Sequence, residues 1–171
     1  AKEAISSLSE KGILSGNGKG LFLPSNKITR AEFIKLITEA LMLDEGTATI
    51  SFEDVSSKDW YYSYVQKAVS NGIVKGKSDV YFGASEFISR QDMATLIYRA
   101  LTKLNKIKPL DTVSKKYTDY QDISSYAKNS ILMLSEYGII NGYEDGSYRP
   151  FGNAARAEAA QLIYNVSLFI E

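Results

Sequence analysis

The chain has 171 residues, of which 44% are hydrophobic, and its 20 lysine and arginine residues balance 20 aspartate and glutamate residues. This length and apolar content suffice for a folded domain with a core, and the balanced charge argues against nucleic acid as a partner. The absence of cysteine excludes disulfides and thiol nucleophiles, and the absence of histidine removes the most common general base and metal ligand. No apolar run approaches the roughly 20 residues of a membrane-spanning helix, so we expect no membrane insertion.

The first segment is predicted to be helical. Residues 1–11 place Ala4, Ile5 and Leu8 three and four positions apart, which is the spacing of one helix face. Gly12 follows the last turn, where glycine adopts the left-handed conformation at little cost and ends a helix. The opening residues do not form a signal peptide, and we expect the chain to be a mature piece of a larger protein.

A loop that starts at Gly16 leads to a second predicted helix, which Thr29 caps. Glu32 lies three residues later and completes a capping box with Thr29. An apolar stripe follows at helical spacing and consists of Phe33, Ile34, Ile37, Ala40 and Leu41.

The same two-helix pattern returns twice further along the chain. Its markers are an aromatic residue at the start of the first helix, a glycine at its end, and an arginine in the first turn of the second helix. In the middle of the chain these markers are Trp60, Gly72 and Arg90. Near the end of the chain they are Tyr126, Gly138 and Arg156.

Constant spacing identifies these segments as internal repeats. The distance from the helix-ending glycine to the arginine, Arg30 in the first repeat, is 18 residues in all three cases. A second glycine recurs at the same place within this interval, as Gly16, Gly76 and Gly142. We divide the chain into repeats at 1–43, 52–104 and 117–171, joined by linkers at 44–51 and 105–116.

A unit of two helices cannot bury both of its apolar stripes alone and must pack on its neighbours. Three such units can stack as an open solenoid or close around a pseudo-threefold axis. The sequence pattern by itself leaves both arrangements open.

Taken together, the motifs resemble the S-layer homology (SLH) domain, over essentially the whole chain, as three tandem copies. The motifs that carry the resemblance are Phe52-x-Asp54-Val55, Trp60, Gly72-Ile73-x-x-Gly76, Asp145-Gly146-x-Tyr148-x-Pro150 and Thr29-Arg30-Ala31-Glu32. The resemblance implies an all-α fold in which three helix-loop-helix repeats close as a pseudo-threefold trimer around a central helix bundle. In the first repeat, the Phe-x-Asp-Val motif and the aromatic residue would precede Ala1, which leaves one groove in question.

The resemblance also implies a function outside the cell, at the cell wall or S-layer. SLH domains anchor larger bacterial surface proteins without a covalent bond by binding a secondary cell-wall polysaccharide, typically one with pyruvate ketals on amino-sugar units. The binding grooves of the family lie between repeats, and the arginine of the four-residue motif is the main ligand contact. This implies ligand-binding roles for Arg30, Arg90 and Arg156, and neither a cofactor nor catalysis. Asp54 and Asp119 are further candidate ligand-binding residues.

The arginines have a physical reason to bind a carboxylate. A helix N-terminus offers backbone N–H groups and the positive end of its dipole to an anion, and arginine adds a planar fork. The acidic residue two places on is expected to cap the helix rather than to touch ligand. The alternative interpretation is that the arginines bridge to Asp54 or Asp119 of a neighbouring repeat and only hold the repeats together.

The remaining candidate residues have two interpretations each. Trp60 and Tyr126 are either core residues or platforms for a sugar. Gly16, Gly76 and Gly142 either permit a tight loop or let backbone N–H groups approach a ligand. Asp145 and Gly146 indicate a turn rather than a calcium site, because alternating oxygen ligands are missing.

Two rival functions remain at this point. The chain could mediate protein contacts or self-assembly of a surface layer without binding glycan directly. It could also be a glycan hydrolase, which needs a pair of carboxylates in a cleft. No such pair recurs apart from the capping positions, so we expect no enzymatic activity.

Overall fold

The computed structural model describes residues 1–16, 21–110, 113–114 and 117–171, and the predicted linker 105–116 falls partly outside this range. In the described residues the secondary structure is helical, with isolated β-bridges but no strand, as the all-α prediction required. The elements are α1 (Lys2–Glu10), α2 (Arg30–Ala40), α3 (Tyr62–Ser70), α4 (Arg90–Lys103), η1 (Tyr120–Asp122), α5 (Ser125–Glu136) and α6 (Arg156–Ile170).

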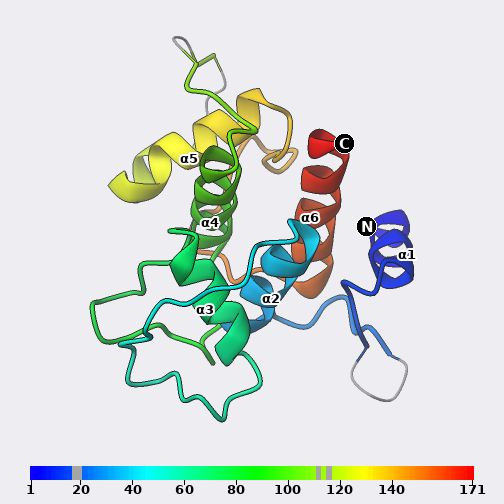
Figure 1. The fold of residues 1–171 in the computed structure, drawn as a ribbon. Coiled ribbons are helices and arrows are strands. Elements are labelled where there is room, and N and C mark those ends of the chain that lie inside the picture. Colours follow the sequence, from blue (N-terminus) through cyan, green and yellow to red (C-terminus); the bar gives the residue numbers. More distant parts are fainter. Residues whose placement is uncertain (17–20, 111–112, 115–116) are drawn as a thin grey trace.

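The helices pack in a cyclic order. The first helix of a repeat packs on the second helix of the preceding repeat, so that α3 lies on α2 and α5 lies on α4. The same relation continues from the end of the chain to its beginning, because α1 packs on α6. Figure 1 shows the N-terminal α1 beside the C-terminal α6. An open solenoid would leave these two helices far apart, so the arrangement is closed.

A ring of three backbone hydrogen bonds marks the pseudo-threefold axis. The N–H of Ile28 donates to the carbonyl of Ala154 at 3.1 Å, and the N–H of Ala154 donates to the carbonyl of Ile88 at 3.0 Å. The N–H of Ile88 closes the ring by donating to the carbonyl of Ile28 at 3.0 Å. All three side chains are buried. The ring decides between the two arrangements that the repeat pattern left open.

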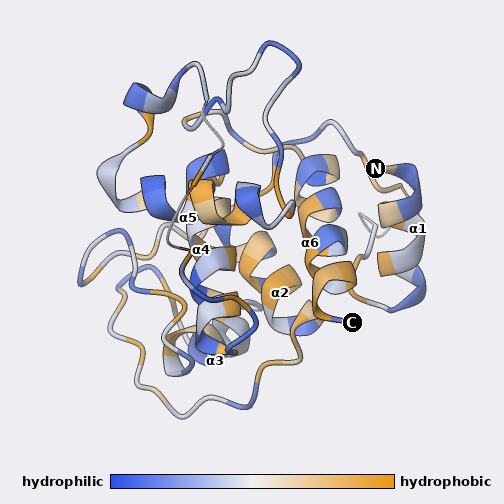
Figure 2. Ribbon diagram, turned by 90° about the horizontal axis from the view of Figure 1, so that it is seen from above, coloured by the Kyte–Doolittle hydropathy of each residue, from blue (hydrophilic) through white to orange (hydrophobic). Residues whose placement is uncertain are grey.

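The second helices of the repeats form the inner layer of the molecule. In the first two repeats, α2 and α4 bury seven and eight residues, whereas α1 and α3 bury two each. In the third repeat, α5 and α6 bury six residues each. In Figure 2, α2, α4 and α6 occupy the middle of the molecule, with α1 and α3 at its edge. The central bundle is therefore built from the helices that begin with the repeated arginines.

The predicted helix stops are confirmed. Gly12, Gly72 and Gly138 have φ angles of 73°, 70° and 71°, in the left-handed region that glycine tolerates best. After each glycine, an isoleucine N–H donates at 2.9 Å to a carbonyl of the preceding helix, and each of these isoleucines is buried. One helix start was predicted wrongly, because α3 begins at Tyr62 and Trp60 lies in the turn before it.

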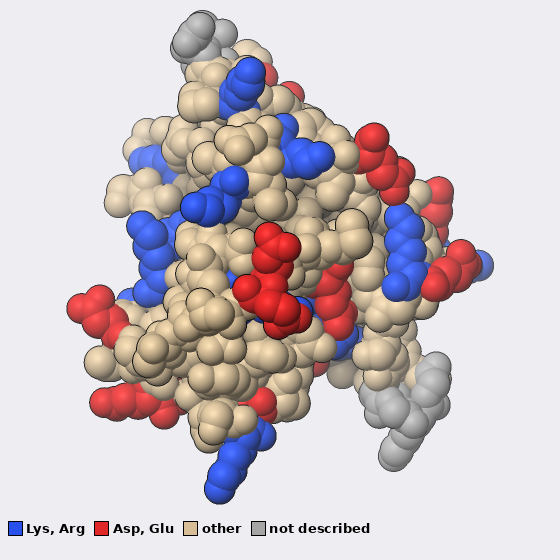
Figure 3. Space-filling model, viewed as in Figure 1, with Lys and Arg blue, Asp and Glu red and all other residues tan. Residues whose placement is uncertain are grey.

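Charged side chains of both signs are scattered over the face of the molecule that Figure 3 shows. Figure 3 shows acidic and basic residues next to one another on the viewed face, without a continuous basic stripe. Among the described helices, none combines the length and the apolar character that a crossing of the bilayer would require.

Replacing Gly138 by alanine should lower the free energy of unfolding by about 1 kcal/mol, because a Cβ is disfavoured at positive φ. No heavy atom lies within 4 Å of the added Cβ, so the cost is conformational rather than steric. Urea denaturation measures this change, and Lys103→Ala on the exposed side of α4 is the control, with a change below about 0.5 kcal/mol. A Gly138→Ala variant as stable as the control would contradict the assignment.

Candidate functional site

Each of the three arginines reaches from the start of an inner helix into the loop of another repeat. The guanidinium of Arg30 lies over the ring of Phe82 at 5.1 Å from its centroid. Two further pairs, Arg90 over Tyr148 and Arg156 over Phe22, both have a separation of 4.9 Å. A groove therefore forms between each inner helix and the loop of the next repeat, in cyclic order. We name the grooves after their arginines.

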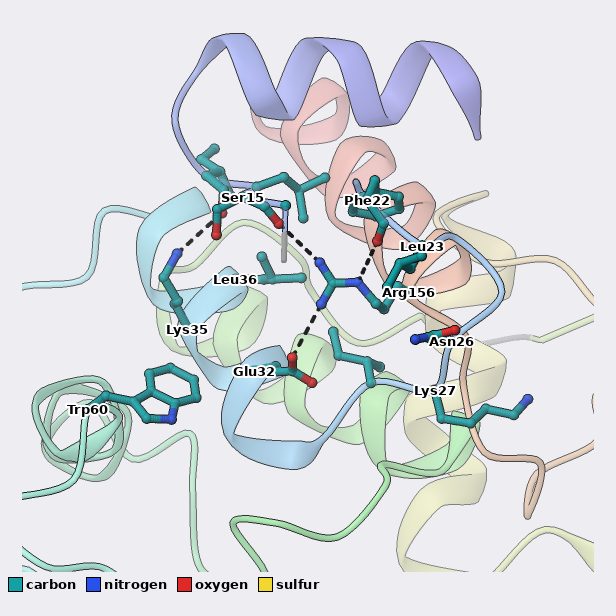
Figure 4. A pocket seen from close by; sticks show the side chains of 14 residues that line it. Ser15, Phe22, Leu23, Asn26, Lys27, Glu32, Lys35, Leu36, Trp60 and Arg156 are labelled. Carbon is teal, nitrogen blue, oxygen red and sulfur yellow. Dashed lines mark hydrogen bonds and ion pairs between the residues drawn. The ribbon is translucent and has the colours of Figure 1, made fainter. Parts of the chain in front are cut away.

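The Arg156 groove has a volume of about 390 Å³. Each of the three guanidinium nitrogens of Arg156 donates a hydrogen bond to an oxygen of the protein (Figure 4). Nε of Arg156 donates to the carbonyl of Phe22 at 2.9 Å. The two terminal nitrogens donate to Glu32 Oε1 at 3.2 Å and to the carbonyl of Ser15 at 3.0 Å. The guanidinium of Arg156, in the third repeat, thus links that repeat to the first repeat through three hydrogen bonds.

In the Arg90 groove, which has a volume of about 200 Å³, the arginine makes a corresponding set of contacts. Nε of Arg90 donates to the carbonyl of Tyr148 at 2.9 Å, and one terminal nitrogen donates to Glu158 Oε1 at 2.6 Å. The other terminal nitrogen has a weaker contact of 3.5 Å with the carbonyl of Asn141. The hydroxyl of Tyr143 also donates to Glu158, at 3.0 Å.

The acidic residue of the four-residue motif has two roles. In Glu32 and Glu158, Oε2 accepts a hydrogen bond of 2.8 Å from the N–H of the N-cap residue, Thr29 or Ala155, as the capping prediction required. The prediction does not hold for the side chain of Asp92, which forms no capping box with Ser89. Oε1 accepts from the arginine of another repeat, which sequence reasoning missed. Burial would raise the pKa of Glu158, but the Ala155 N–H and the charge of Arg90 more than offset this and lower it.

The Arg30 groove, of about 350 Å³, differs from the other two. Arg30 is only 5% exposed, yet its Nε has no hydrogen-bond partner, and its guanidinium donates to no other described residue. Its counterpart to Glu32 is the shorter Asp92, whose Oδ1 instead accepts a 2.8 Å hydrogen bond from the hydroxyl of Tyr126. Burial lowers the pKa of Arg30; the charge of Asp92 opposes this shift, and that of Arg99 adds to it.

The backbone N–H groups at the helix starts are not available to an anion, so this part of the sequence argument was wrong. The first two N–H groups of α2 donate to the carbonyls of Glu86 and Ala84, at 2.8 and 3.1 Å. The corresponding groups of α4 and α6 donate in the same way to loop carbonyls of Gly152, Pro150, Asn26 and Pro24. An anion in these grooves would therefore meet guanidinium groups rather than a helix terminus.

The alternative partners proposed for the arginines, Asp54 and Asp119, are also wrong. The carboxylate of Asp54 accepts hydrogen bonds of 2.8 to 3.0 Å from three consecutive N–H groups, those of residues 82–84. Asp119 accepts from the N–H groups of Tyr148 and Arg149, at 2.8 and 2.7 Å. Both carboxylates therefore hold the loop that presents the aromatic ring to the arginine. Burial would raise the pKa of Asp54, but the N–H groups lower it below its usual value.

The two candidate aromatic residues lie at groove rims and not in the core. Trp60 is 56% exposed and lines the Arg156 groove, and Tyr126 is 52% exposed and lines the Arg30 groove.

Two of the three candidate glycines, Gly76 and Gly142, serve close packing of the loops. A Cβ on Gly76 would lie 2.5 Å from the ring of Phe52, and one on Gly142 would lie 2.6 Å from the ring of Tyr117. Gly16 and Gly76 line the Arg156 and Arg30 grooves. Gly142 borders a separate shallow hollow. The described residues contain no group of three acidic side chains that could hold a metal ion.

Sequence reasoning missed Arg99 and Lys77, which also line the Arg30 groove. A signal for Arg99 was present in the repeat alignment. Counted from the motif arginine, its position is occupied by Glu39 in the first repeat and by Asn165 in the third. The position is thus positive in the second repeat, negative in the first and neutral in the third. This difference in charge sets the Arg30 groove apart from the other two grooves.

Comparison with known proteins agrees with this architecture. The sequence model of the S-layer homology domain matches residues 1–34, 51–94 and 116–160. The chain is 32% identical to an amylopullulanase of Thermoanaerobacterium thermosulfurigenes, over 97% of this chain and 9% of that protein.

Two further relatives have names that concern the cell surface. The chain is 32% identical to a cellulosome-anchoring protein of Acetivibrio thermocellus, over 88% of this chain and 34% of that protein. It is also 32% identical to an S-layer protein of Bacillus thuringiensis subsp. finitimus, over 94% of this chain and 19% of that protein. The chain thus spans about a third or less of the length of these relatives.

Replacing Glu158 by glutamine should lower the free energy of unfolding at pH 7 by about 1.5 to 3 kcal/mol, because Arg90 loses its charged partner while a capping oxygen remains. Urea denaturation gives the value, and the exposed Glu144→Gln serves as the control for charge alone. Equal free energies of unfolding for the two variants would show that the ion pair of Arg90 and Glu158 does not stabilise the contact between the second and third repeats.

Stability should also fall in acid. The folded pKa values of Asp54 and Glu158 are depressed, so their contribution is complete above the unfolded values of about 3.9 and 4.3. It is lost as the pH falls through the lower folded values. We expect the free energy of unfolding to decline below about pH 4, with a shallower decline in Asp54→Asn. A profile that is flat from pH 7 to pH 3 would contradict this.

Proposed function

Because the chain belongs to the S-layer homology domain family, whose members are cell-surface anchoring modules, we propose that it binds a pyruvylated secondary cell-wall polysaccharide. The polysaccharide would lie in the grooves between repeats and hold a larger protein to the bacterial cell wall without a covalent bond. The names of two relatives, a cellulosome-anchoring protein and an S-layer protein, support this role.

The observation that carries the proposal is the buried guanidinium of Arg30. Arg30 is stacked on the ring of Phe82, but its buried Nε has no hydrogen-bond partner and it forms no ion pair with a described residue, which is costly for a buried charge. An arginine fork matches the two oxygens of a carboxylate. A pyruvate ketal presents one carboxylate on a rigid ring, so it could neutralise Arg30 with little loss of conformational entropy. A neutral glycan offers no charge for this purpose.

The exposed aromatic residues at the rims add a second kind of contact. Tyr126 stands beside Arg30, and Trp60 lines the Arg156 groove. An amphipathic ring can cover the apolar face of a sugar while its polar atom remains hydrogen-bonded. The Arg30 groove therefore combines a contact for an acid group with one for the sugar that carries it.

We also propose that the chain itself is not catalytic. Hydrolysis of a glycoside needs an acid and a base that are free to exchange protons. The repeated glutamates Glu32 and Glu158 are instead engaged by helix caps and arginines. The enzymatic name of the amylopullulanase belongs to a protein of which this chain spans only 9%.

Cosedimentation with purified wall sacculi tests the proposal. The chain should sediment with untreated walls and remain in the supernatant after mild acid has removed the pyruvate ketals, because Arg30 then has no carboxylate to bind. Walls kept at neutral pH for the same time are the control. Undiminished binding to acid-treated walls would contradict recognition of the carboxylate. Sedimentation of the chain without any walls would favour the rival function of self-assembly.

A further inference from the structure

We propose that the three grooves differ in function: the Arg30 groove is the anion-binding site of the chain, and the Arg90 and Arg156 grooves are internal ties between repeats. Asp92 and Arg99 would establish this difference. The inference rests on the proposed function and goes beyond it by assigning the ligand to one groove and by naming the residues that select it.

The first argument is the length of the side chain at position 92. In the other two repeats the acidic residue is glutamate, and its Oε1 pairs with an arginine, at 3.2 Å for Glu32 and 2.6 Å for Glu158. Asp92 is one methylene shorter, forms no ion pair with Arg30 in the described part of the chain, and is held by Tyr126 instead. A ligand carboxylate would thus take the place that glutamate occupies in the other grooves.

The second argument is the charge balance of the Arg30 groove. Its lining includes Arg30, Lys77 and Arg99 but only one acid, Asp92. Lys77 is paired with Glu86, which lies outside the lining residues. Two guanidinium groups therefore face one carboxylate that forms an ion pair with neither in the described residues. The lining of the Arg156 groove also has three basic residues and one acid, but its single guanidinium pairs with that acid, Glu32.

The third argument is the state of Arg99. Among the described residues, its guanidinium donates one hydrogen bond, a long contact of 3.5 Å with the carbonyl of Ile73, and is therefore weakly held. The positive charge of Arg99 also repels that of Arg30. A carboxylate bound between the two arginines would offset this repulsion and pair with a terminal nitrogen of Arg30, as the glutamates do in the other two grooves. The other two repeats have Glu39 and Asn165 at this position and cannot supply this second cation.

Calorimetric titration with a synthetic amino sugar that carries a pyruvate ketal tests the assignment. The wild-type chain should bind one sugar per chain, and the methyl ester of the same ketal should bind at least 10-fold more weakly. The substitution Asp92→Glu should supply the internal partner of Arg30 and weaken binding at least 10-fold. Its free energy of unfolding should be unchanged or raised, which separates blockage of the groove from damage to the fold.

Two further variants complete the experiment. Arg99→Asn introduces the residue that the third repeat has at this position and should weaken binding about 10-fold. Asp122→Glu makes the same chemical change as Asp92→Glu at an exposed position in η1, outside the groove, and should leave the affinity within twofold.

The outcomes separate this inference from the proposed function. If Asp92→Glu binds the pyruvylated sugar as tightly as the wild type, or if three sugars bind per chain, the assignment to one groove is overturned while the proposed function stands. If the wild type binds the ketal and its methyl ester equally well, carboxylate recognition fails, and both proposals are overturned.

Discussion

The ring of backbone hydrogen bonds among Ile28, Ile88 and Ala154 is the constraint on which the rest of the structure depends. These residues lie just before the inner helices, so their pairing fixes where each helix begins relative to the loop of the next repeat. The first N–H groups of the helices are then satisfied by carbonyls of that loop, and each arginine is placed over its aromatic ring. The backbone contacts that close the fold therefore also form the grooves.

The same guanidinium can serve the fold or a ligand, and its internal partners decide which. Arg90 and Arg156 each pair with a glutamate and two carbonyls, so a ligand would have to replace contacts that already exist. Charge-assisted hydrogen bonds of this kind contribute about 1.5 to 3 kcal/mol each, and a ligand gains little by exchanging them. Arg30 has no such contacts to lose. Its unsatisfied state costs the folded chain stability, which a bound anion would return.

The features that sequence predicted well are local ones. A capping box at Thr29 and a left-handed glycine at position 138 depend on neighbours within a few residues, so the pattern alone determines them. The partners of the arginines could not be predicted in this way, because they come from residues more than 60 positions away. Closure around the axis was expected only from the family resemblance, since repeats with the same stripes could also stack openly. The aspartate at position 92 was visible in the sequence. Its effect on Arg30 could not be predicted, because the sequence does not show that the start of α4 lies opposite Arg30.

A closed ring also has no first or last repeat, which distinguishes it from an open array. The packing of α1 on α6 makes every repeat a neighbour of both others, so positions 32, 92 and 158 occupy equivalent places around the axis. An exchange of aspartate and glutamate between two of these positions would keep the order of the repeats around the axis, although the helix that receives aspartate would lose the glutamate hydrogen bond to its N-cap N–H. It would nevertheless move the unpaired arginine to a different groove. The location of such a site is thus a property of single side chains, and the symmetry of the fold lets it change without any rebuilding of the backbone.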